Sequence, residues 1–165
     1  MSRDLAQGIR GYGVPYVPTP NIKISLLIEN LNLKKGDLFI DIGCGDGIIL
    51  EAVKKQFPEA RVIGYEKSYR PYLDAIKKRE KNGLDYEIRN EDFFLAGIKE
   101  ANVLYSYMIS YMMEKIWSKI NSDCRDGTIL ISSSFPISSK LPKTTLNVGG
   151  NKNLFIYEVE KKRVP

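Results

Sequence analysis

The sequence predicts an α/β protein with a doubly wound, mostly parallel sheet that ends in an antiparallel hairpin. Short apolar segments typical of buried strands alternate with amphipathic segments typical of helices, which indicates βαβ units. The last two strand-like segments flank a Gly-Gly-Asn turn, which indicates a hairpin. With 165 residues, the chain is long enough for one domain of this kind.

The first half of the chain contains two strand-and-helix units after an opening helix. Thr19 and Pro20 are expected to begin that helix, as its N-cap and its first-turn residue. The segment LFIDI is a continuous apolar run, as in strands that are buried on both faces. The elements expected next are a strand at 38–42, a helix at about 47–57, a strand at 61–65 and a helix at 71–82.

The second half continues the alternation and then changes character. We expect a strand at 85–89, a strand at 101–108, a helix through Glu114, Trp117 and Ile120, and a strand at 128–134. The segments KTTLNV and LFIYEVE then flank Gly149, Gly150 and Asn151, which predicts the hairpin. Residues 1–19 are predicted to form an arm or lid, since Gly and Pro are frequent there, and 20–165 a single domain.

The composition excludes several kinds of chemistry. The chain has no histidine, so it has no Ser-His-Asp triad, no Cys-His pair and no His-ligated zinc. Two distant cysteines are too few for a thiolate metal site, and no metal is expected. The net charge of +5 permits contact with nucleic acid without demonstrating it. With no apolar run long enough for a bilayer and no apolar signal core, a cytoplasmic monomer without membrane contact is expected.

A glycine-rich turn, DIGCGDG, joins the first strand to its helix. At such a junction a ligand meets free backbone N–H groups and the positive end of the helix dipole. The spacing is GxGxG, whereas dinucleotide binders have GxGxxG. Asp41 and Asp46 stand beside this turn, and two carboxylates repel a phosphate but attract an ammonium or a sulfonium.

Acidic residues also follow the second and third strands. Glu66 stands 19 residues after Gly47, a distance at which a carboxylate can accept both hydroxyls of a ribose. Asp92 could accept the exocyclic amine of adenine, with Phe93 or Phe94 as an apolar wall. Since the carboxyl ends of parallel strands meet at one edge, these groups predict a single nucleoside-binding crevice.

The sequence DIGCGDG, with Glu66 and Asp92 behind it, resembles the class I S-adenosylmethionine-dependent methyltransferases, which have a Rossmann-like sheet. The resemblance implies that the glycine turn binds the methionine part of the cofactor, Glu66 the ribose and Asp92 the adenine. Lys67 stands where that family usually has an apolar residue, and its aliphatic stem could cover the adenine. The cofactor-binding residues expected are Tyr16, Thr19, Asp41, Gly43, Cys44, Gly45, Asp46, Gly47, Glu66, Lys67, Asp92 and Phe93.

The segment PYVPTP at 15–20 looks like the YVPTP segment of the small archaeal protein-lysine methyltransferases and their mitochondrial relatives. The resemblance implies a protein-lysine N-methyltransferase whose partner is a protein that presents a lysine, basic chromatin-type proteins included. At 132–135 the chain has Ser-Ser-Ser-Phe, where this family often has Ser-His-Glu-Phe.

Methyl transfer from a sulfonium is an in-line displacement that needs positioning and a free lone pair on the acceptor. An apolar, aromatic channel favours the neutral form of an acceptor lysine. Tyr16 and Tyr107 are the candidate catalytic residues for such a channel, with Tyr105, Met108 and Tyr111 nearby in the sequence. Alternation along the fourth strand predicts that Tyr105 and Tyr107 share a face.

Three alternatives remain open, of which a small-molecule methyltransferase is the least favoured, because no inserted segment is large enough to make a closed substrate pocket. An RNA or DNA methyltransferase agrees with the basic charge, but residues 106–109 lack the Asn/Asp-Pro-Pro-aromatic motif of amino-directed enzymes, and neither cysteine follows a proline. Ribose and ring-nitrogen targets stay compatible with the sequence. The remaining alternative is a non-catalytic protein that binds the cofactor with the same fold; a Pro/Gly-rich lid argues against it, because a lid mainly closes a reaction site.

Overall fold

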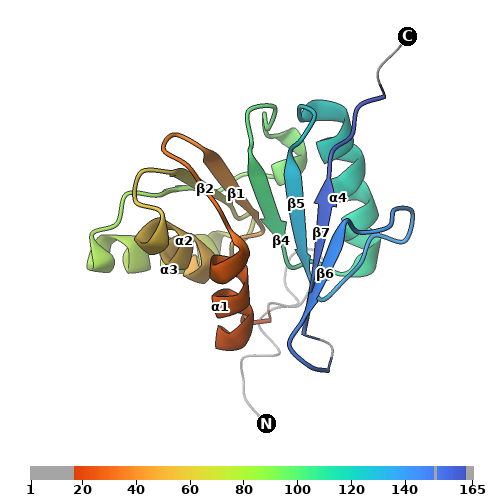
Figure 1. The fold of residues 1–165 in the computed structure, drawn as a ribbon. Helices are drawn as coiled ribbons and strands as arrows, with labels where there is room; N and C mark the ends of the chain where they lie inside the picture. The colour runs from red at the N-terminus through yellow and green to blue at the C-terminus, as the bar shows by residue number, and fades with distance from the viewer. Residues whose placement is uncertain (1–16, 151, 163–165) are drawn as a thin grey trace.

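The computed structural model describes residues 17–150 and 152–162 (Figure 1). The strands are β1 (Leu38–Ile42), β2 (Arg61–Tyr65), β3 (Glu87–Arg89), β4 (Val103–Ser106), β5 (Ile129–Ser133), β6 (Thr144–Asn147) and β7 (Asn153–Glu158). The helices are α1 (Asn21–Asn30), α2 (Ile48–Gln56), α3 (Tyr69–Asn82), α4 (Ser110–Asp123) and a 3-10 helix, η1 (Phe93–Leu95).

The strands of the described chain form one sheet in the order β3-β2-β1-β4-β5-β7-β6. The first five in this order are parallel, whereas β7 pairs antiparallel with both β5 and β6. The doubly wound sheet with a final hairpin is therefore confirmed. The chain leaves β1 toward β2 and β3 and returns to the other side of β1 with β4, so the order reverses beside β1, where open α/β sheets bind ligands.

Helices cover both faces of the sheet. On one face α1, α2 and α3 pack against the strands through residues that include Leu27, Leu50 and Ala75. On the other face α4 packs through Met113, Ile116 and Ile120, next to η1. None of the helices in the described ranges has both the length and the apolar character of a membrane span.

The observed ends of several elements differ from the expected ones. Helix α1 begins at Asn21 with Pro20 as its N-cap residue, so the prediction that Thr19 is the N-cap was wrong. The Thr19 hydroxyl lies beside the Tyr105 side chain instead. Strand β5 ends at Ser133 because the next residue, Ser134, has a positive φ of 69°, which an extended strand cannot accommodate.

The other differences in length follow from pairing and from proline. Strands β3 and β4 are shorter than the expected 85–89 and 101–108, since they pair only where their neighbours run alongside. Helix α3 starts at Tyr69, two residues before the expected Pro71, because proline is tolerated within the first turn of a helix.

Gly64 in β2 allows α2 and the glycine turn to pack closely on the sheet. A Cβ atom at this position would lie 2.5 Å from Leu50 Cδ1 and 2.6 Å from Cys44 Sγ. We therefore expect Gly64→Ala to lower the free energy of unfolding by about 1–3 kcal/mol, since an overpacked core must shift. Urea unfolding measures this change. Gly97→Ala is the matched control, because nothing lies within 4 Å of its Cβ position; equal effects of the two substitutions would contradict the packing argument.

Candidate functional site

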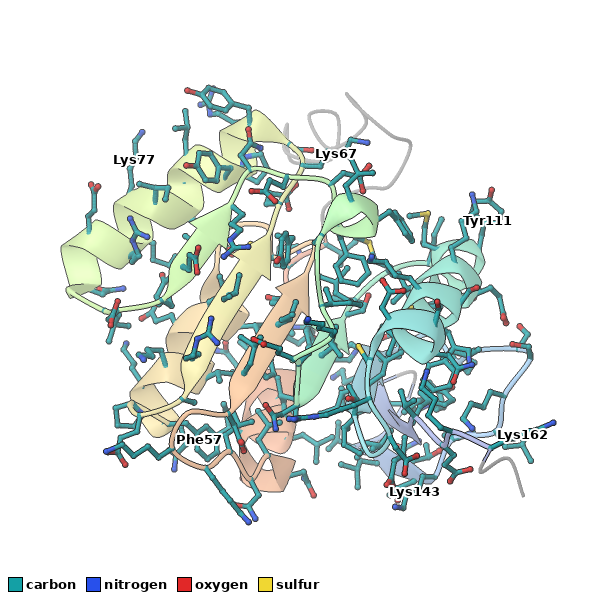
Figure 2. The ribbon with its side chains drawn as sticks, turned by 90° about the horizontal axis from the view of Figure 1, so that it is seen from above. Phe57, Lys67, Lys77, Tyr111, Lys143 and Lys162 are labelled. Atoms are coloured by element: carbon teal, nitrogen blue, oxygen red, sulfur yellow. The ribbon has the colours of Figure 1, made fainter. Side chains whose placement is uncertain are left out.

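The carboxyl ends of the parallel strands bring the predicted site residues to one edge of the sheet. Ile42 at the end of β1 is in register with Tyr65 of β2 and with Ser106 of β4. The segments after these strands therefore begin side by side. Figure 2 shows Lys67 and Tyr111 at the edge toward which the arrows of β1 and β2 point, and Phe57 and Lys143 at the opposite edge.

The glycine turn after β1 has a conformation that favours glycine. Gly43, Gly45 and Gly47 have φ values of 69°, 55° and 81°. A Cβ atom on Gly43 would lie 2.3 Å from Met108 Cε, so the segment after β4 packs directly on the turn. Gly47 is the N-cap residue of α2, which turns the first N–H groups of this helix toward the crevice edge.

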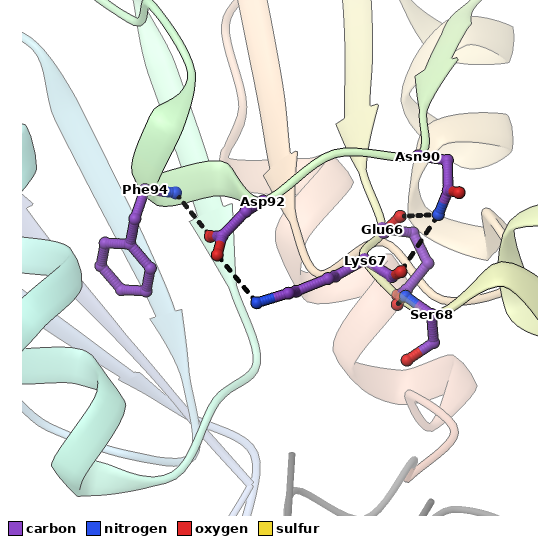
Figure 3. A network of polar contacts seen from close by, with 6 residues as sticks. All are labelled: Glu66, Lys67, Ser68, Asn90, Asp92 and Phe94. Atoms are coloured by element: carbon purple, nitrogen blue, oxygen red, sulfur yellow. Dashed lines mark hydrogen bonds and ion pairs between the residues drawn. The ribbon is translucent and has the colours of Figure 1, made fainter. Parts of the chain in front are cut away.

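The Glu66 carboxylate accepts hydrogen bonds from the turns that follow β1 and β2. Its Oε2 accepts a hydrogen bond of 2.9 Å from the Gly45 N–H, and its Oε1 accepts one of 2.8 Å from the Ser68 N–H. The Asn90 side chain donates to the carbonyl oxygens of Glu66 and Lys67 at 2.9 and 3.1 Å (Figure 3). The ends of β1, β2 and β3 are thus joined by polar contacts.

Three carboxylates converge at the turn after β1. Asp41 is 3% exposed, and burial raises its pKa well above 3.8, with further increases from the charges of Glu66 and Asp46. Asp46 is partly compensated, because its Oδ2 lies 2.8 Å from Lys78 Nζ. The same burial and carboxylates raise the pKa of Cys44, which keeps it a thiol. The turn is a site that a cation would stabilise.

Asp92 is the N-cap residue of η1 and contacts the segment that follows β2. Its Oδ1 accepts a hydrogen bond from the Phe94 N–H at 3.0 Å, and its Oδ2 lies 2.9 Å from Lys67 Nζ (Figure 3). The hydrogen bond from Lys67 lowers the pKa of Asp92 and keeps it ionised. Phe93 is buried against the Tyr65 ring, with centroids 6.1 Å apart, and forms an apolar wall. The sequence did not predict the pairing of Lys67.

The aromatic residues after β4 divide into two groups. Tyr105 and Tyr107 pack on the same side of the sheet, as predicted from alternation. Tyr111, at 65% exposure, lies at the surface away from them. Tyr16 lies outside the described residues. The carboxyl ends thus bring together the predicted residues on 41–47, 66–67 and 92–93, whereas Tyr111 does not join them.

Sequence reasoning missed Lys23, which is buried on α1 and lies 4.6 Å from the centroid of the Tyr107 ring. The helical period of the sequence indicates that Lys23 lies on the buried face. Lys23 precedes the buried residues Leu27 and Leu31 by four and eight positions, so it belongs to the apolar face of α1.

The sequence matches the family model described as the ANTKMT methyltransferase domain over residues 41–144. A protein-lysine N-methyltransferase of Saccharolobus islandicus is 31% identical over 147 residues, which are 87% of this chain and 91% of that protein. A ribosomal protein L11 methyltransferase of Thermotoga neapolitana is 26% identical over 104 residues, or 63% of this chain and 38% of the relative.

A solved structure supports the same relationship. The crystal structure of an RNA methyltransferase from Salinibacter ruber in complex with S-adenosyl-L-homocysteine superposes with a TM-score of 0.81 at 26% identity. The match covers 90% of this chain and 97% of that one.

The charge of Glu66 is one cause of the raised pKa of Asp41, and this can be tested directly. We expect Glu66→Gln to lower the Asp41 pKa while burial keeps it above 3.8. A carboxyl group with a raised pKa stabilises the fold below its unfolded pKa, and this contribution is lost as pH rises through the folded pKa. In Glu66→Gln the stabilising contribution of protonated Asp41 should therefore disappear at a lower pH than in the unmodified chain. Carbon-13 NMR titration of the Asp41 carboxyl measures the shift. Exposed Glu59→Gln is the control, and an unchanged Asp41 pKa in Glu66→Gln would contradict the analysis.

Proposed function

Because this chain belongs to the ANTKMT methyltransferase domain family, we propose that this S-adenosylmethionine-dependent methyltransferase transfers its methyl group to a lysine amine of a protein. The observation that carries the proposal is the similarity, along nearly the whole of both chains, to the protein-lysine N-methyltransferase of Saccharolobus islandicus. The protein substrate, the lysine target and the roles of individual residues are parts of the proposal.

The residues at the crevice fit S-adenosylmethionine. The cofactor supplies a methyl group on a positively charged sulfur, and it also carries an ammonium group. The carboxylates of Asp41 and Asp46 suit these positive charges. Glu66 would accept the ribose hydroxyls with the lone pairs that its contacts to the Gly45 and Ser68 N–H groups leave over, and Asp92 with Phe93 would hold the adenine. The backbone of the turn would contact the methionine part of the cofactor through Gly43, Cys44 and Gly47. Thr19 would flank the cofactor.

The acceptor lysine must reach the crevice as a neutral amine. A protonated lysine has no free lone pair, and an aromatic, poorly hydrated channel favours its deprotonation. Tyr107 is half-buried, and the centroids of the Tyr107 and Phe135 rings lie 6.3 Å apart with an interplanar angle of 32°. These two rings would form one wall of the channel, next to the end of β4. We propose Tyr107 as a positioning wall for the acceptor, and Tyr16 on the arm of residues 1–19 as its counterpart.

Apolar side chains around the crevice edge support a protein partner. They belong to the segment before α1, to the starts of α1, α3 and α4 and to η1, and we call them the apolar rim: Val17, Ile22, Tyr69, Leu95 and Tyr111. Leu95 is 87% exposed. Apolar contacts of this kind bind a polypeptide, whereas a nucleic acid backbone is held mainly by Lys and Arg.

An RNA methyltransferase is the second candidate function. The similarity to the Salinibacter ruber protein, whose chain is covered almost completely, favours it, and so does the net charge of +5. The carboxylates near the crevice oppose it, because Glu91 and Asp92 would face an incoming phosphate backbone. We therefore rank it below the protein-lysine assignment.

The acceptor class can be measured with methyl-labelled S-adenosylmethionine. We expect the chain to label basic proteins, and acid hydrolysis of the labelled protein to release methylated lysine. Glu66→Ala should bind S-adenosylhomocysteine about 10-fold or more weakly and lose label in proportion, since it removes the proposed ribose contacts. Ribonuclease-sensitive label would favour the second candidate, and cofactor binding without any transfer would favour a non-catalytic protein.

The ion pair between Lys67 and Asp92 competes with the proposed adenine contact. We expect Lys67→Met to raise the affinity for S-adenosylhomocysteine by up to about fivefold, because an exposed ion pair contributes about 1 kcal/mol or less and Met still covers the adenine. Calorimetric titration measures the affinity. Lys55→Met, which breaks the pair of Lys55 with Glu51 on α2, is the control. Weaker binding by Lys67→Met would instead assign the Lys67 amine a direct role in holding the cofactor.

A further inference from the structure

A buried lysine lies at the carboxyl edge of the sheet, beyond the glycine turn. Lys23 on α1 is 2% exposed. Its Nζ donates hydrogen bonds to Ser133 Oγ at 3.2 Å and to Ser134 Oγ. The contact with Ser133 places the start of α1 beside the carboxyl end of β5.

The charge of Lys23 has no anionic counterpart in residues 17–150 and 152–162. None of the ion pairs in these ranges includes it, and its hydrogen-bond acceptors there are hydroxyl groups. Burial lowers the pKa of Lys23, and the charge of Lys152 lowers it further. A buried ammonium is costly unless an anion compensates it, so this position favours an anionic ligand.

The backbone conformation of Ser134 brings its hydroxyl group into contact with Lys23. Ser134 is the non-glycine residue of the described chain with a positive φ, 69°. Such a conformation costs free energy in a residue with a Cβ, and it places the Ser134 hydroxyl on Lys23 Nζ. Ser133 is fully buried at the end of β5, and its hydroxyl contacts both Lys23 and the Tyr105 side chain.

These groups form a row of polar residues across three neighbouring strands. Asp41 of β1 is in register with Tyr105 of β4, and Tyr105 with Ile131 of β5, so Ser133 lies two residues further along on the same face. The charge of Asp41 acts on the Tyr105 hydroxyl, which also lies beside Ser133. The row therefore has a carboxylate at one end and the ammonium of Lys23 at the other.

The methionine part of S-adenosylmethionine is a zwitterion with the complementary order of charges. Its α-ammonium suits the carboxylate of Asp41, and the buried ammonium of Lys23 at the other end of the row suits its α-carboxylate. We propose that Lys23, together with the hydroxyl groups of Ser133 and Ser134, binds this α-carboxylate. The inference rests on the proposed function, with the cofactor bound at this edge of the sheet. Lys23 is then a cofactor-binding residue that orients the amino acid tail, with the α-carboxylate at Lys23 and the α-ammonium at Asp41.

A comparison of two ligands distinguishes binding of the α-carboxylate by Lys23 from a general effect of the substitution on the cofactor site. S-adenosylhomocysteine carries the carboxylate, whereas 5′-methylthioadenosine keeps the nucleoside and lacks the amino acid tail. We expect Lys23→Met and Lys23→Gln to bind S-adenosylhomocysteine about 10- to 100-fold more weakly than the unmodified chain, the range for losing a hydrogen bond to a charged group. Affinity for 5′-methylthioadenosine should stay within about twofold of the unmodified chain, since only the tail contact is removed.

The measurement is calorimetric titration of each folded variant, with thermal unfolding to confirm the fold. Lys77→Met, on the exposed side of α3, is the matched control for the loss of one positive charge and should bind both ligands as the unmodified chain does. Equal S-adenosylhomocysteine affinity in the Lys23 variants, or an equal loss for both ligands, would overturn the proposal. An unmodified chain that binds neither ligand would instead contradict the cofactor site itself.

Discussion

The structure of the site depends on the carboxylate of Glu66, which holds the turns after β1 and β2 together. Through hydrogen bonds to the Gly45 and Ser68 N–H groups it fixes the glycine turn against the neighbouring strand end. This arrangement brings a third negative charge close to Asp41 and Asp46. Like charges at a poorly hydrated edge repel one another, so the site is most stable when a positively charged ligand binds there.

The same charge arrangement explains why this Rossmann-like edge suits a sulfonium cofactor. In a dinucleotide site the helix end after β1 faces a pyrophosphate and must stay free of carboxylates. Here Asp41 and Asp46 flank that helix end, while a buried cation, Lys23, lies at the carboxyl end of β5. A ligand with positive charge at the turn and negative charge at its far end satisfies both.

Much of this could be predicted from the sequence because it depends on local patterns. Strands β1 and β2 were predicted to the residue, since both are short and almost continuously apolar, with clear glycine and proline boundaries. Glu66 was predicted from its distance to the glycine turn, and Asp92 from its position after the third strand. The contacts of Lys67 with Asp92 and of Lys23 with Ser133 could not be predicted, because they join residues far apart in the chain and depend on the register of parallel strands. The N-cap was misplaced by one residue, because Pro20 precedes the first helical turn and its carbonyl oxygen accepts the first hydrogen bonds of the helix.

We infer that a cationic methyl donor binds over the turns that Glu66 and Asp92 hold. Amide NMR spectra recorded during titration with S-adenosylmethionine test it most directly, because the N–H groups of Gly45, Ser68 and Phe94 are hydrogen-bonded to these two carboxylates. We expect the largest shifts at these three amides and at the neighbouring glycines of the turn. Shifts confined to other parts of the sheet, or none at saturating ligand, would contradict it.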